Sequence, residues 1–497
     1  MKSSVAIRVN ADSTIGLGHF SRCLTLSEEL IRRGIEVHIV SHTLPPDWEH
    51  YALSAGVILH LLVDKKSGYQ RDETPRALDE SDAQQTVNIL TTNGIEILIV
   101  DCYQITDVWA EVAAQNARLI ILDDGQNVNI ECAIRIDFAM TENSAISGRN
   151  IFCGPRFSLI HPSYRVVSQS QRVWQKTPQD IFVYLGATYQ PNTFTQVLEL
   201  VGRSLRHGNS VSLLSSDFLR YGNLTDDWRR QIPLNVVRDS RTLADTFQCA
   251  DFAIGAAGMS SMERACAGVP SLQLILTKNQ CASAAWLQRE GAAECLEVSR
   301  LKDSESDQKL SSLLNNLEQL EKMSNNGKRL VDGLGALRVA ELINPTNLRQ
   351  VVMRNATAED IWTFFDWTND PTARQNSLQT ETVNHETHRR WFQEQLTSTS
   401  VELVLFELSE LPVSQLRLTK ADGDATISYS VDIMARGRGL GMKMIQDLVQ
   451  RERGTRRFKK LKAVVKHENE SSLAIFKATG FSAIRSSKSE IHLEIEV

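Results

Sequence analysis

Short apolar runs alternate with longer amphipathic stretches over residues 1–150. Residues 20–33 have the apolar period of a helix that ends at Gly34. Strands that alternate with helices in this way predict a parallel sheet with helices on both faces. The strands expected in this part of the chain are residues 5–9, 36–40, 95–100 and 119–122.

The same alternation starts again after a less regular stretch that contains Pro155, Pro162 and Pro178, which suggests a connection between two units. Two such halves predict two Rossmann-like domains with a ligand cleft between them, because open parallel sheets bind ligands beyond the carboxyl ends of their strands. Strands are expected at residues 181–185, 210–214, 252–254 and 271–276, and helices at 193–205, 243–250 and 260–267.

The pattern changes again near residue 348, after a polar helical segment at 306–343 and a break that contains Pro345. Helices come first, and consecutive strands follow at 401–407, 413–418 and 425–433, which predicts a separate α+β domain. The fold class is therefore expected to be α/β, with two Rossmann-like domains around a cleft followed by an α+β domain. The expected domains are residues 1–165, 166–343 and 349–497.

Composition narrows the class of protein. The length of 497 residues suits about three folding units, and a net charge of -6 gives no general attraction to nucleic acid or anionic membrane. No apolar run approaches the ~20 residues that span a bilayer, and no signal peptide precedes the first strand, so a cytoplasmic location is expected. Eight cysteines without a C-x-x-C spacing favour free thiols and give no zinc site.

A glycine turn follows the first strand at residues 16–23, GLGHFSRC. Gly16 and Gly18 allow a tight turn and the close approach of a substrate, and the turn places His19 at the start of a helix, facing the cleft. The N-terminus of a helix disfavours positive charge, so the imidazole there is neutral, which is the form that a general base needs near pH 7. The alternative is a simple turn with His19 as a helix cap.

A second glycine turn, at residues 255–258, opens another helix. Its small residues allow backbone N–H groups to reach a diphosphate, and the helix dipole favours that negative charge. Glu263 in the first helical turn has a carboxylate that could accept both ribose hydroxyls, although a capping role is the alternative. The amides of Asn279 and Gln280 suit sugar hydroxyls or N-acetyl groups, and a helix cap is the alternative for Asn279. The substrate-binding residues expected from the two turns are Gly16, Gly18, Arg22, Gly258, Ser260, Ser261, Glu263, Asn279 and Gln280.

Several ordered motifs resemble one enzyme family, the UDP-2,4-diacetamido-2,4,6-trideoxy-β-L-altropyranose hydrolases of pseudaminic acid biosynthesis. The motifs are GLGHFSRC at 16–23, VDCY at 100–103, GPRFSLIHP at 154–162, IGAAG at 254–258, SMER at 261–264 and NQ at 279–280. The resemblance implies the two-domain fold of nucleotide-sugar glycosyltransferases and an inverting hydrolysis that releases UDP. It implies His19 as the base, with Asp101 and Tyr103 near the sugar. The chain departs from the family at residues 186–189 and at Met262, which leaves the exact sugar open.

The third glycine turn, RGRGLG at 436–441, resembles the acyl-CoA loop of GNAT-type N-acetyltransferases, and residues 469–476 and 480–481 match the same family. Successive N–H groups at a helix N-terminus suit the CoA pyrophosphate. Residues 367–370 and 388–392 resemble the acetyltransferase of the pseudaminic pathway, which acetylates the 4-amino group of the UDP-sugar. Phe476 stands where many relatives have a tyrosine that protonates the leaving thiolate. The residues expected to bind acetyl-CoA are Arg436, Gly437, Arg438, Gly439, Gly441 and Asn469.

The sequence therefore predicts a bifunctional enzyme whose ligands are a UDP-sugar and acetyl-CoA, without a metal and without a nucleic-acid or membrane partner. Hydrolysis is expected to persist in EDTA, because no group of residues has the spacing of metal ligands. The alternative is a UDP-sugar glycosyltransferase of the same two-domain fold, with a regulatory or differently specific GNAT domain.

Overall fold

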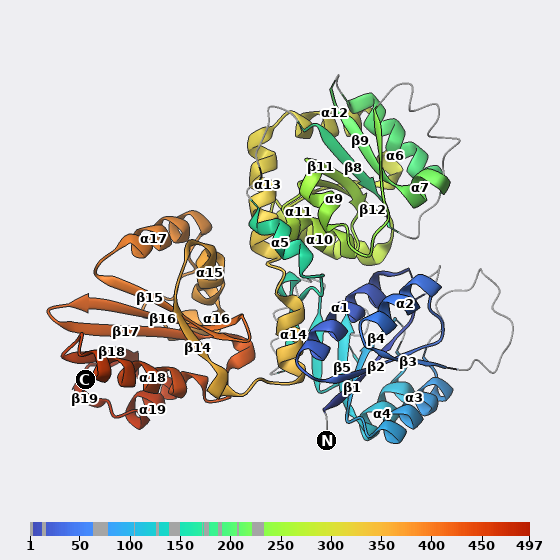
Figure 1. Cartoon of the computed structure of the whole chain (residues 1–497). Helices are drawn as coiled ribbons and strands as arrows, with labels where there is room; N and C mark the ends of the chain where they lie inside the picture. The colour runs from blue at the N-terminus through green and yellow to red at the C-terminus, as the bar shows by residue number, and fades with distance from the viewer. Residues whose placement is uncertain are drawn as a thin grey trace. The chain divides into compact units, whose positions relative to one another are not determined.

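The computed structural model divides into two compact units, Met1–Ala340 and Glu341–Val497. The first unit contains two sheets and the second contains one (Figure 1). The structure describes residues 3–11, 16–62, 78–103, 105–125, 129–138, 150–170, 172, 178–186, 191–205, 208–220 and 233–497, without the side chains of Pro191, Arg220 and Asn279.

The first sheet has seven parallel strands in the order β3-β2-β1-β4-β5-β6-β7. The order of the strands reverses between β1 and β4, so the loops that follow these two strands diverge at the carboxyl edge and leave room for a ligand there. The strands are β1 Ser4–Val9, β2 Glu36–Ser41, β3 Ile58–Leu61, β4 Ile97–Asp101, β5 Arg118–Asp123, β6 Ile134–Asp137 and β7 Ile151–Cys153. The helices are α1 Gly18–Arg32, α2 Pro46–Ser54, α3 Glu80–Asn93 and α4 Asp107–Asn116.

The second sheet has six parallel strands in the order β10-β9-β8-β11-β12-β13, with the reversal between β8 and β11. Its central strands are buried on both faces, which explains why they are continuous apolar runs in the sequence. The strands are β8 Asp180–Tyr184, β9 Ser210–Leu214, β10 Leu234–Val237, β11 Phe252–Ala256, β12 Ser271–Ile275 and β13 Glu294–Glu297. The helices are α6 Pro191–Ser204, α7 Ser215–Arg220, α9 Ala244–Cys249, α10 Met259–Ala267, α11 Cys281–Arg289, α12 Ser304–Leu314 and α13 Leu317–Leu330.

The stretch expected to be an irregular connection is partly ordered structure. It contains β7 and the helix α5, Ser163–Gln169, whose Tyr164 packs in the core of the second half with Phe182 and Phe247. A three-residue strand and a seven-residue helix are too short to show a period, which is why the sequence did not reveal them. Later in the chain, α14, Gly335–Ile343, returns to the first half, where Arg33 Nη2 donates to the Leu337 carbonyl at 3.1 Å.

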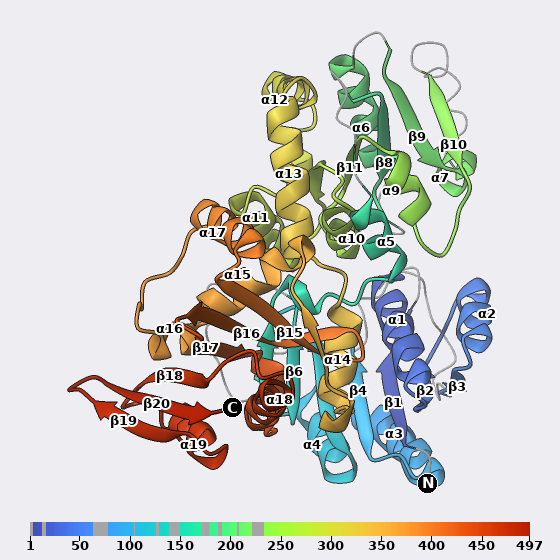
Figure 2. The same cartoon turned by 60° about the vertical axis from the view of Figure 1, so that its left-hand side comes forward.

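The second unit has a seven-stranded mixed sheet in the order β14-β15-β16-β17-β18-β20-β19. In both views α15 and α17 cover one face of this sheet, and α18 and α19 cover the other (Figures 1 and 2). The strands are β14 Val352–Asn355, β15 Val401–Leu408, β16 Leu411–Ala421, β17 Asp424–Val431, β18 Lys460–Lys466, β19 Ser482–Ser486 and β20 Glu490–Glu496. The helices are α15 Ile361–Asn369, α16 Pro371–Asn376, α17 His385–Thr397, α18 Leu440–Thr455 and α19 Glu470–Ala478.

Three strands were expected in this unit, and the structure adds four. In β18 lysines alternate with buried apolar residues, so the basic composition of the segment concealed the strand. The pair β17 and β18 is the only parallel pair of the sheet, with α18 as the crossover between them. Their register ends at the Ile427–Ala463 pair, although β17 continues to Val431 and β18 to Lys466. The two strands therefore diverge toward their carboxyl ends.

Two further properties concern the chain as a whole. No helix among the described residues has the length and apolar character required to cross a membrane. The described cysteines are free thiols.

Candidate active sites

A histidine and an aspartate form a close pair at the point where the first sheet reverses its strand order. His19 is the second residue of α1, and Asp101 is the last residue of β4. His19 Nδ1 lies 2.6 Å from Asp101 Oδ1, and both residues are buried. The carboxylate holds the imidazole proton on Nδ1, which leaves Nε2 as the nitrogen that can accept a proton.

Arg22 lies one turn further along α1 and joins this pair. Its Nε donates to Asp101 Oδ2 at 2.6 Å, and its Nη2 donates to Oδ1 at 2.5 Å. Burial alone would raise the pKa of Asp101, but the Arg22 guanidinium and His19 hold it well below its usual range. Asp101 is therefore an ionised carboxylate whose oxygens are used within the protein. Asp101 therefore orients His19, and its oxygens have little remaining capacity to accept hydrogen bonds from a sugar.

Asp124 is a member of this site that the sequence did not predict. Arg22 Nη1 donates to its two carboxylate oxygens at 2.9 and 3.1 Å, so two carboxylates share one guanidinium. Tyr103 also reaches Asp124, because its hydroxyl donates to Oδ2 at 3.4 Å, and its ring lies edge-on to His19 with centroids 4.5 Å apart. Asp124 follows β5 directly, and β5 neighbours β4. The signal available in the sequence was that Asp124 directly follows the apolar run of β5, as Asp101 ends the apolar run of β4.

The glycine turn of the second sheet lies between β11 and α10. Gly255 lies within β11, and a β-carbon there would lie 2.5 Å from the Tyr184 carbonyl oxygen, so the strand that leads into the turn requires glycine at that position. Gly258 precedes α10, and a β-carbon there would lie 3.5 Å from Gln280 Nε2. A β-carbon on Gly18 would lie 3.8 Å from that of Met259, the first residue of α10. The start of α1, which carries His19, therefore adjoins the start of α10.

Some polar side chains at the start of α10 are used in hydrogen bonds within the protein, and others can still bind a ligand. Ser261 Oγ donates to the Gly258 carbonyl at 2.7 Å, which closes the turn. Ser260 Oγ accepts a hydrogen bond from Arg264 at 3.1 Å, so its own hydroxyl proton remains able to donate to a ligand. Gln280 Oε1 accepts from Leu276 N at 2.9 Å, which directs the amide nitrogen toward the turn. The prediction for Asn279 concerns a side chain outside the described part of the structure.

Glu263 lies in the first turns of α10 and is partly buried. Burial raises its pKa to about 7, against the opposing effect of the hydrogen bond from Tyr164. At neutral pH the carboxyl group is therefore close to half protonated, and it can either accept or donate a hydrogen bond. Tyr164, which the sequence did not single out, is fixed in turn by Leu243 N, which donates to its hydroxyl oxygen at 2.9 Å.

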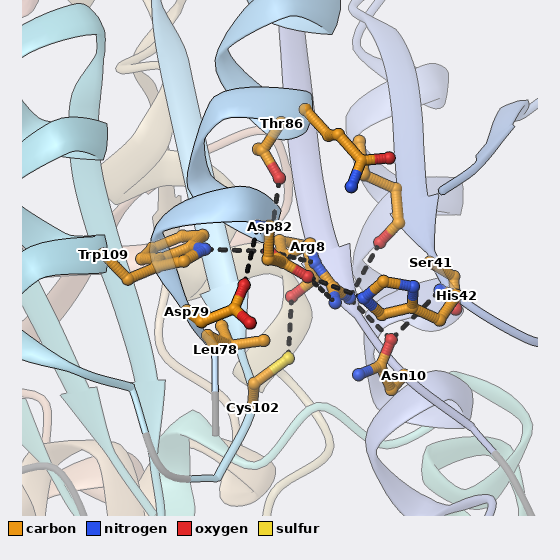
Figure 3. A network of polar contacts seen from close by, with 12 residues as sticks. Arg8, Asn10, Ser41, His42, Leu78, Asp79, Asp82, Thr86, Cys102 and Trp109 are labelled. Carbon is orange, nitrogen blue, oxygen red and sulfur yellow. Dashed lines mark hydrogen bonds and ion pairs between the residues drawn. The ribbon is translucent and has the colours of Figure 1, made fainter. Parts of the chain in front are cut away.

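A second buried polar network fixes the carboxyl ends of β1 and β2 (Figure 3). Arg8 Nη2 donates to Asp82 Oδ2 at 2.6 Å, and Trp109 Nε1 donates to Asp82 Oδ1 at 2.8 Å. His42 Nε2 contacts the same carboxylate at 2.8 Å, and Arg8 Nη1 donates to Asn10 at 2.6 Å. The network ties α3 and α4 to the two strands beside the turn that carries His19.

The third glycine turn, in the second unit, joins β17 to α18. Gly437 and Gly439 have φ angles of 74° and 84°, which favour glycine, and Gly439 is the N-cap of α18. Arg436 Nη2 donates to Asp370 Oδ1 at 2.7 Å, and Arg438 Nη1 donates to Glu341 Oε1 at 2.7 Å. Both guanidinium groups are therefore bound within the unit, and the backbone N–H groups of the turn are the donors left for an anion.

The segment that follows places the remaining predicted residues. Gly441 lies in the first turn of α18, and a β-carbon there would lie 3.0 Å from Ile475 Cδ1. Asn469 is the N-cap of α19, because its Oδ1 accepts from Ser472 N at 3.1 Å. This gives its carbonyl oxygen a structural role. Phe476 is buried in the same helix, and its ring lies edge-on to Tyr429, which the sequence analysis did not identify.

Metal ligands are a separate question. Among the residues that the structure describes, no group of three or more histidine, cysteine, aspartate or glutamate side chains could hold a metal ion.

Comparison with known proteins defines the class of protein. Residues 350–482 match the acetyltransferase (GNAT) domain family. The solved structure of MurG from Acinetobacter baumannii superposes with a TM-score of 0.52 at 13% identity, covering 69% of this chain and 100% of that chain. The chain therefore has MurG-like Rossmann-type domains of the GT-B fold followed by a GNAT acetyltransferase domain, as the sequence predicted.

A match to a curated protein gives more specific information about this chain. The chain is 24% identical over 196 residues to the spore coat polysaccharide biosynthesis protein SpsG of Bacillus subtilis (strain 168). This match covers 39% of the chain and spans 58% of the length of the relative. Spermidine N-acetyltransferase from Vibrio cholerae, solved with CoA and spermine, covers 30% of the chain at 12% identity with a TM-score of 0.28. The chain is thus a homologue of SpsG at low identity that carries a GNAT domain.

Proposed function

We propose that the first unit hydrolyses a UDP-linked 2,4-diacetamido-2,4,6-trideoxyhexose to the free sugar and UDP, with inversion at the anomeric carbon. The observation that carries this proposal is the buried His19–Asp101 pair at the start of α1, adjacent to the start of α10. A base next to an anion-binding helix end is the arrangement that hydrolysis of a sugar diphosphate requires. The likeness to a polysaccharide biosynthesis protein is consistent with it.

The residues of the first unit have separate roles in this reaction. His19 Nε2 takes a proton from the water that attacks the anomeric carbon, and Asp101 stabilises the imidazolium that forms. The N–H groups at the start of α10 and the Ser260 hydroxyl stabilise the negative charge of the leaving UDP. Glu263 binds the ribose hydroxyls, and Gln280 binds a sugar substituent. No metal takes part.

The second unit acetylates the 4-amino group of the UDP-sugar that the first unit then hydrolyses. The two reactions are adjacent steps of nonulosonic acid biosynthesis of the pseudaminic type, which accounts for their presence on one chain. The backbone N–H groups of the turn at residues 436–441 bind the pyrophosphate of acetyl-CoA. The expected domains, residues 1–165, 166–343 and 349–497, and the cytoplasmic location are part of this proposal, with the whole of α5 assigned to the second domain.

The test is mass spectrometry of the products from a UDP-4-amino-4,6-dideoxy-sugar with and without acetyl-CoA. The free diacetamido sugar and UDP are expected only when acetyl-CoA is present. His19→Ala should lower the rate of UDP release by about two to four orders of magnitude while UDP binding survives. His50→Ala, at an exposed histidine of α2, is the control and should leave the rate unchanged. Near-normal hydrolysis by His19→Ala would remove the base from the mechanism.

The glycosyltransferase alternative has a distinct outcome in the same experiment. A transferase releases UDP only when an acceptor is added, whereas a hydrolase releases it in buffer alone. Dependence of UDP release on an acceptor would therefore replace the hydrolase proposal.

A further inference from the structure

The second unit lacks a proton donor at the position that its family resemblance implies. Phe476 of α19 is buried, with 2% of its surface exposed, and has no acidic proton. Tyr429 is the only tyrosine in residues 341–497, and this part of the sequence contains no cysteine. A neutral phenol or thiol donor in this unit can therefore only be Tyr429.

Tyr429 lies beside Phe476, on the strand that leads into the proposed CoA-binding turn. It follows the Ile427–Ala463 pair, the last register position before β17 and β18 diverge. Its ring packs edge-on against Phe476, with centroids 5.9 Å apart and an interplanar angle of 73°. The Tyr429 hydroxyl is thus carried by the strand that leads into the proposed CoA-binding turn.

Two contacts locate the hydroxyl itself. The Tyr429 oxygen lies 3.1 Å from Ser472 Oγ, in the first turn of α19. It would lie 3.8 Å from a β-carbon on Gly441, in the first turn of α18. The phenol is therefore between the starts of the two helices, one helical turn away from Phe476 along α19.

We propose that Tyr429 is the catalytic acid of acetyl transfer in this protein, in place of a tyrosine at position 476. The inference rests on the proposed acetyltransferase function. As the amine nitrogen bonds to the acetyl carbon, the carbon–sulfur bond breaks and its electron pair stays on sulfur. Tyr429 transfers its phenolic proton to that sulfur. The phenolate regains a proton from solvent through the partly exposed Ser472, and the amine releases its proton to solvent.

The environment keeps the acid protonated before the reaction. Burial raises the pKa of Tyr429, and the hydrogen bond with Ser472 opposes that shift. The phenol is neutral at physiological pH and has a proton to give. It can also donate a hydrogen bond to a developing thiolate, which is the interaction that lowers the barrier.

The kinetic test uses the full chain and three variants. Tyr429→Phe should lower kcat for acetyl transfer by about two orders of magnitude, with the KM for acetyl-CoA nearly unchanged. Adding Phe476→Tyr to that variant should recover much of the loss, because it returns a hydroxyl to the family position. Tyr51→Phe, a partly exposed residue of α2, is the matched control and should have no effect.

The second test does not depend on acetyl transfer. The ionisation of the CoA thiol bound to the protein is followed by the ultraviolet absorbance of the thiolate. A hydrogen bond from Tyr429 should allow the bound thiol of the unmodified chain to ionise at a pH about one unit lower than in Tyr429→Phe.

Equal kcat values and equal thiol titrations in the unmodified chain and Tyr429→Phe would overturn the inference. If the unmodified chain binds CoA but acetylates none of the amines offered, the proposed function fails, and the thiol titration still decides the role of Tyr429. Calorimetric CoA binding by each variant shows whether the domain remains folded.

Discussion

Replacing Asp101 with asparagine removes a buried charge that His19 and Arg22 share. The carboxylate accepts from Arg22 at 2.6 and 2.5 Å and contacts His19 Nδ1 at 2.6 Å. An asparagine has one oxygen. When that oxygen takes the place of Oδ2 and accepts from Arg22 Nε, the NH2 group takes the place of Oδ1 and faces His19. The amide would donate to Nδ1, so the imidazole proton would move to Nε2, and the nitrogen that faces the reaction would no longer accept a proton.

The expected loss follows from the removal of the base. General-base catalysis is worth about 10²–10⁴ in rate, which corresponds to about 3–5 kcal/mol in the activation barrier. Asp101→Asn should therefore lower the rate of UDP release at saturating substrate by that factor. The dissociation constant for UDP should change little, because Asp101 does not contact the start of α10. Turnover is measured by UDP release and binding by calorimetry.

A loss of stability could imitate a loss of catalysis, so a matched control is needed. Asp123 is also a buried carboxylate at the end of a parallel strand, and Arg135 Nη1 donates to its Oδ2 at 3.1 Å. Asp123→Asn should destabilise the first unit by a similar amount without changing the tautomer of His19. Turnover of Asp101→Asn within about threefold of the unmodified protein, well below the range for a lost base, would refute the reasoning, as would an equal loss in both variants.

Three other predictions concern stability and CoA binding. Burial raises the pKa of Glu263 to about 7, so its contribution to stability is present at low pH and is lost as the pH rises through about 7. Relative to Glu263→Gln, the free energy of unfolding of the unmodified protein should fall by about 3 kcal/mol between about pH 5 and about pH 8, measured by urea titration. A difference between the two proteins that does not depend on pH would contradict this. Asp82→Asn leaves the buried Arg8 without its carboxylate and should lower the free energy of unfolding by about 3–5 kcal/mol, measured by urea titration. An unchanged urea midpoint would show that the network of Figure 3 contributes little to stability. Gly439→Val forces a β-branched residue into a φ of 84° and should abolish the binding of CoA, measured by calorimetry. UDP binding is the control and should be unaffected. A CoA affinity equal to that of the unmodified chain would exclude the turn as the CoA site.

Local patterns in the sequence were sufficient for the central elements of the fold. The apolar runs around Val5 and Ile254 became central parallel strands, because strands buried on both faces must be continuously apolar. The glycine turns were predictable for a similar reason, since positive φ angles such as those of Gly16 and Gly439 favour glycine wherever the chain folds back. Strands with one partly exposed face, such as β18, were missed, because such strands carry charged residues.

The sequence by itself determined which residue types stand at the ends of strands and the starts of helices, and this was sufficient to nominate His19. Only the tertiary structure decided which of these groups meet. His19 and Asp101 are 82 residues apart, and they are in contact because β1 pairs with β4. Tyr429 and Phe476 meet in the same way, through the packing of α19 against the third sheet. Periodicity and turn chemistry act over a few neighbouring residues, whereas these contacts depend on strand order, which the packing of the whole sheet sets.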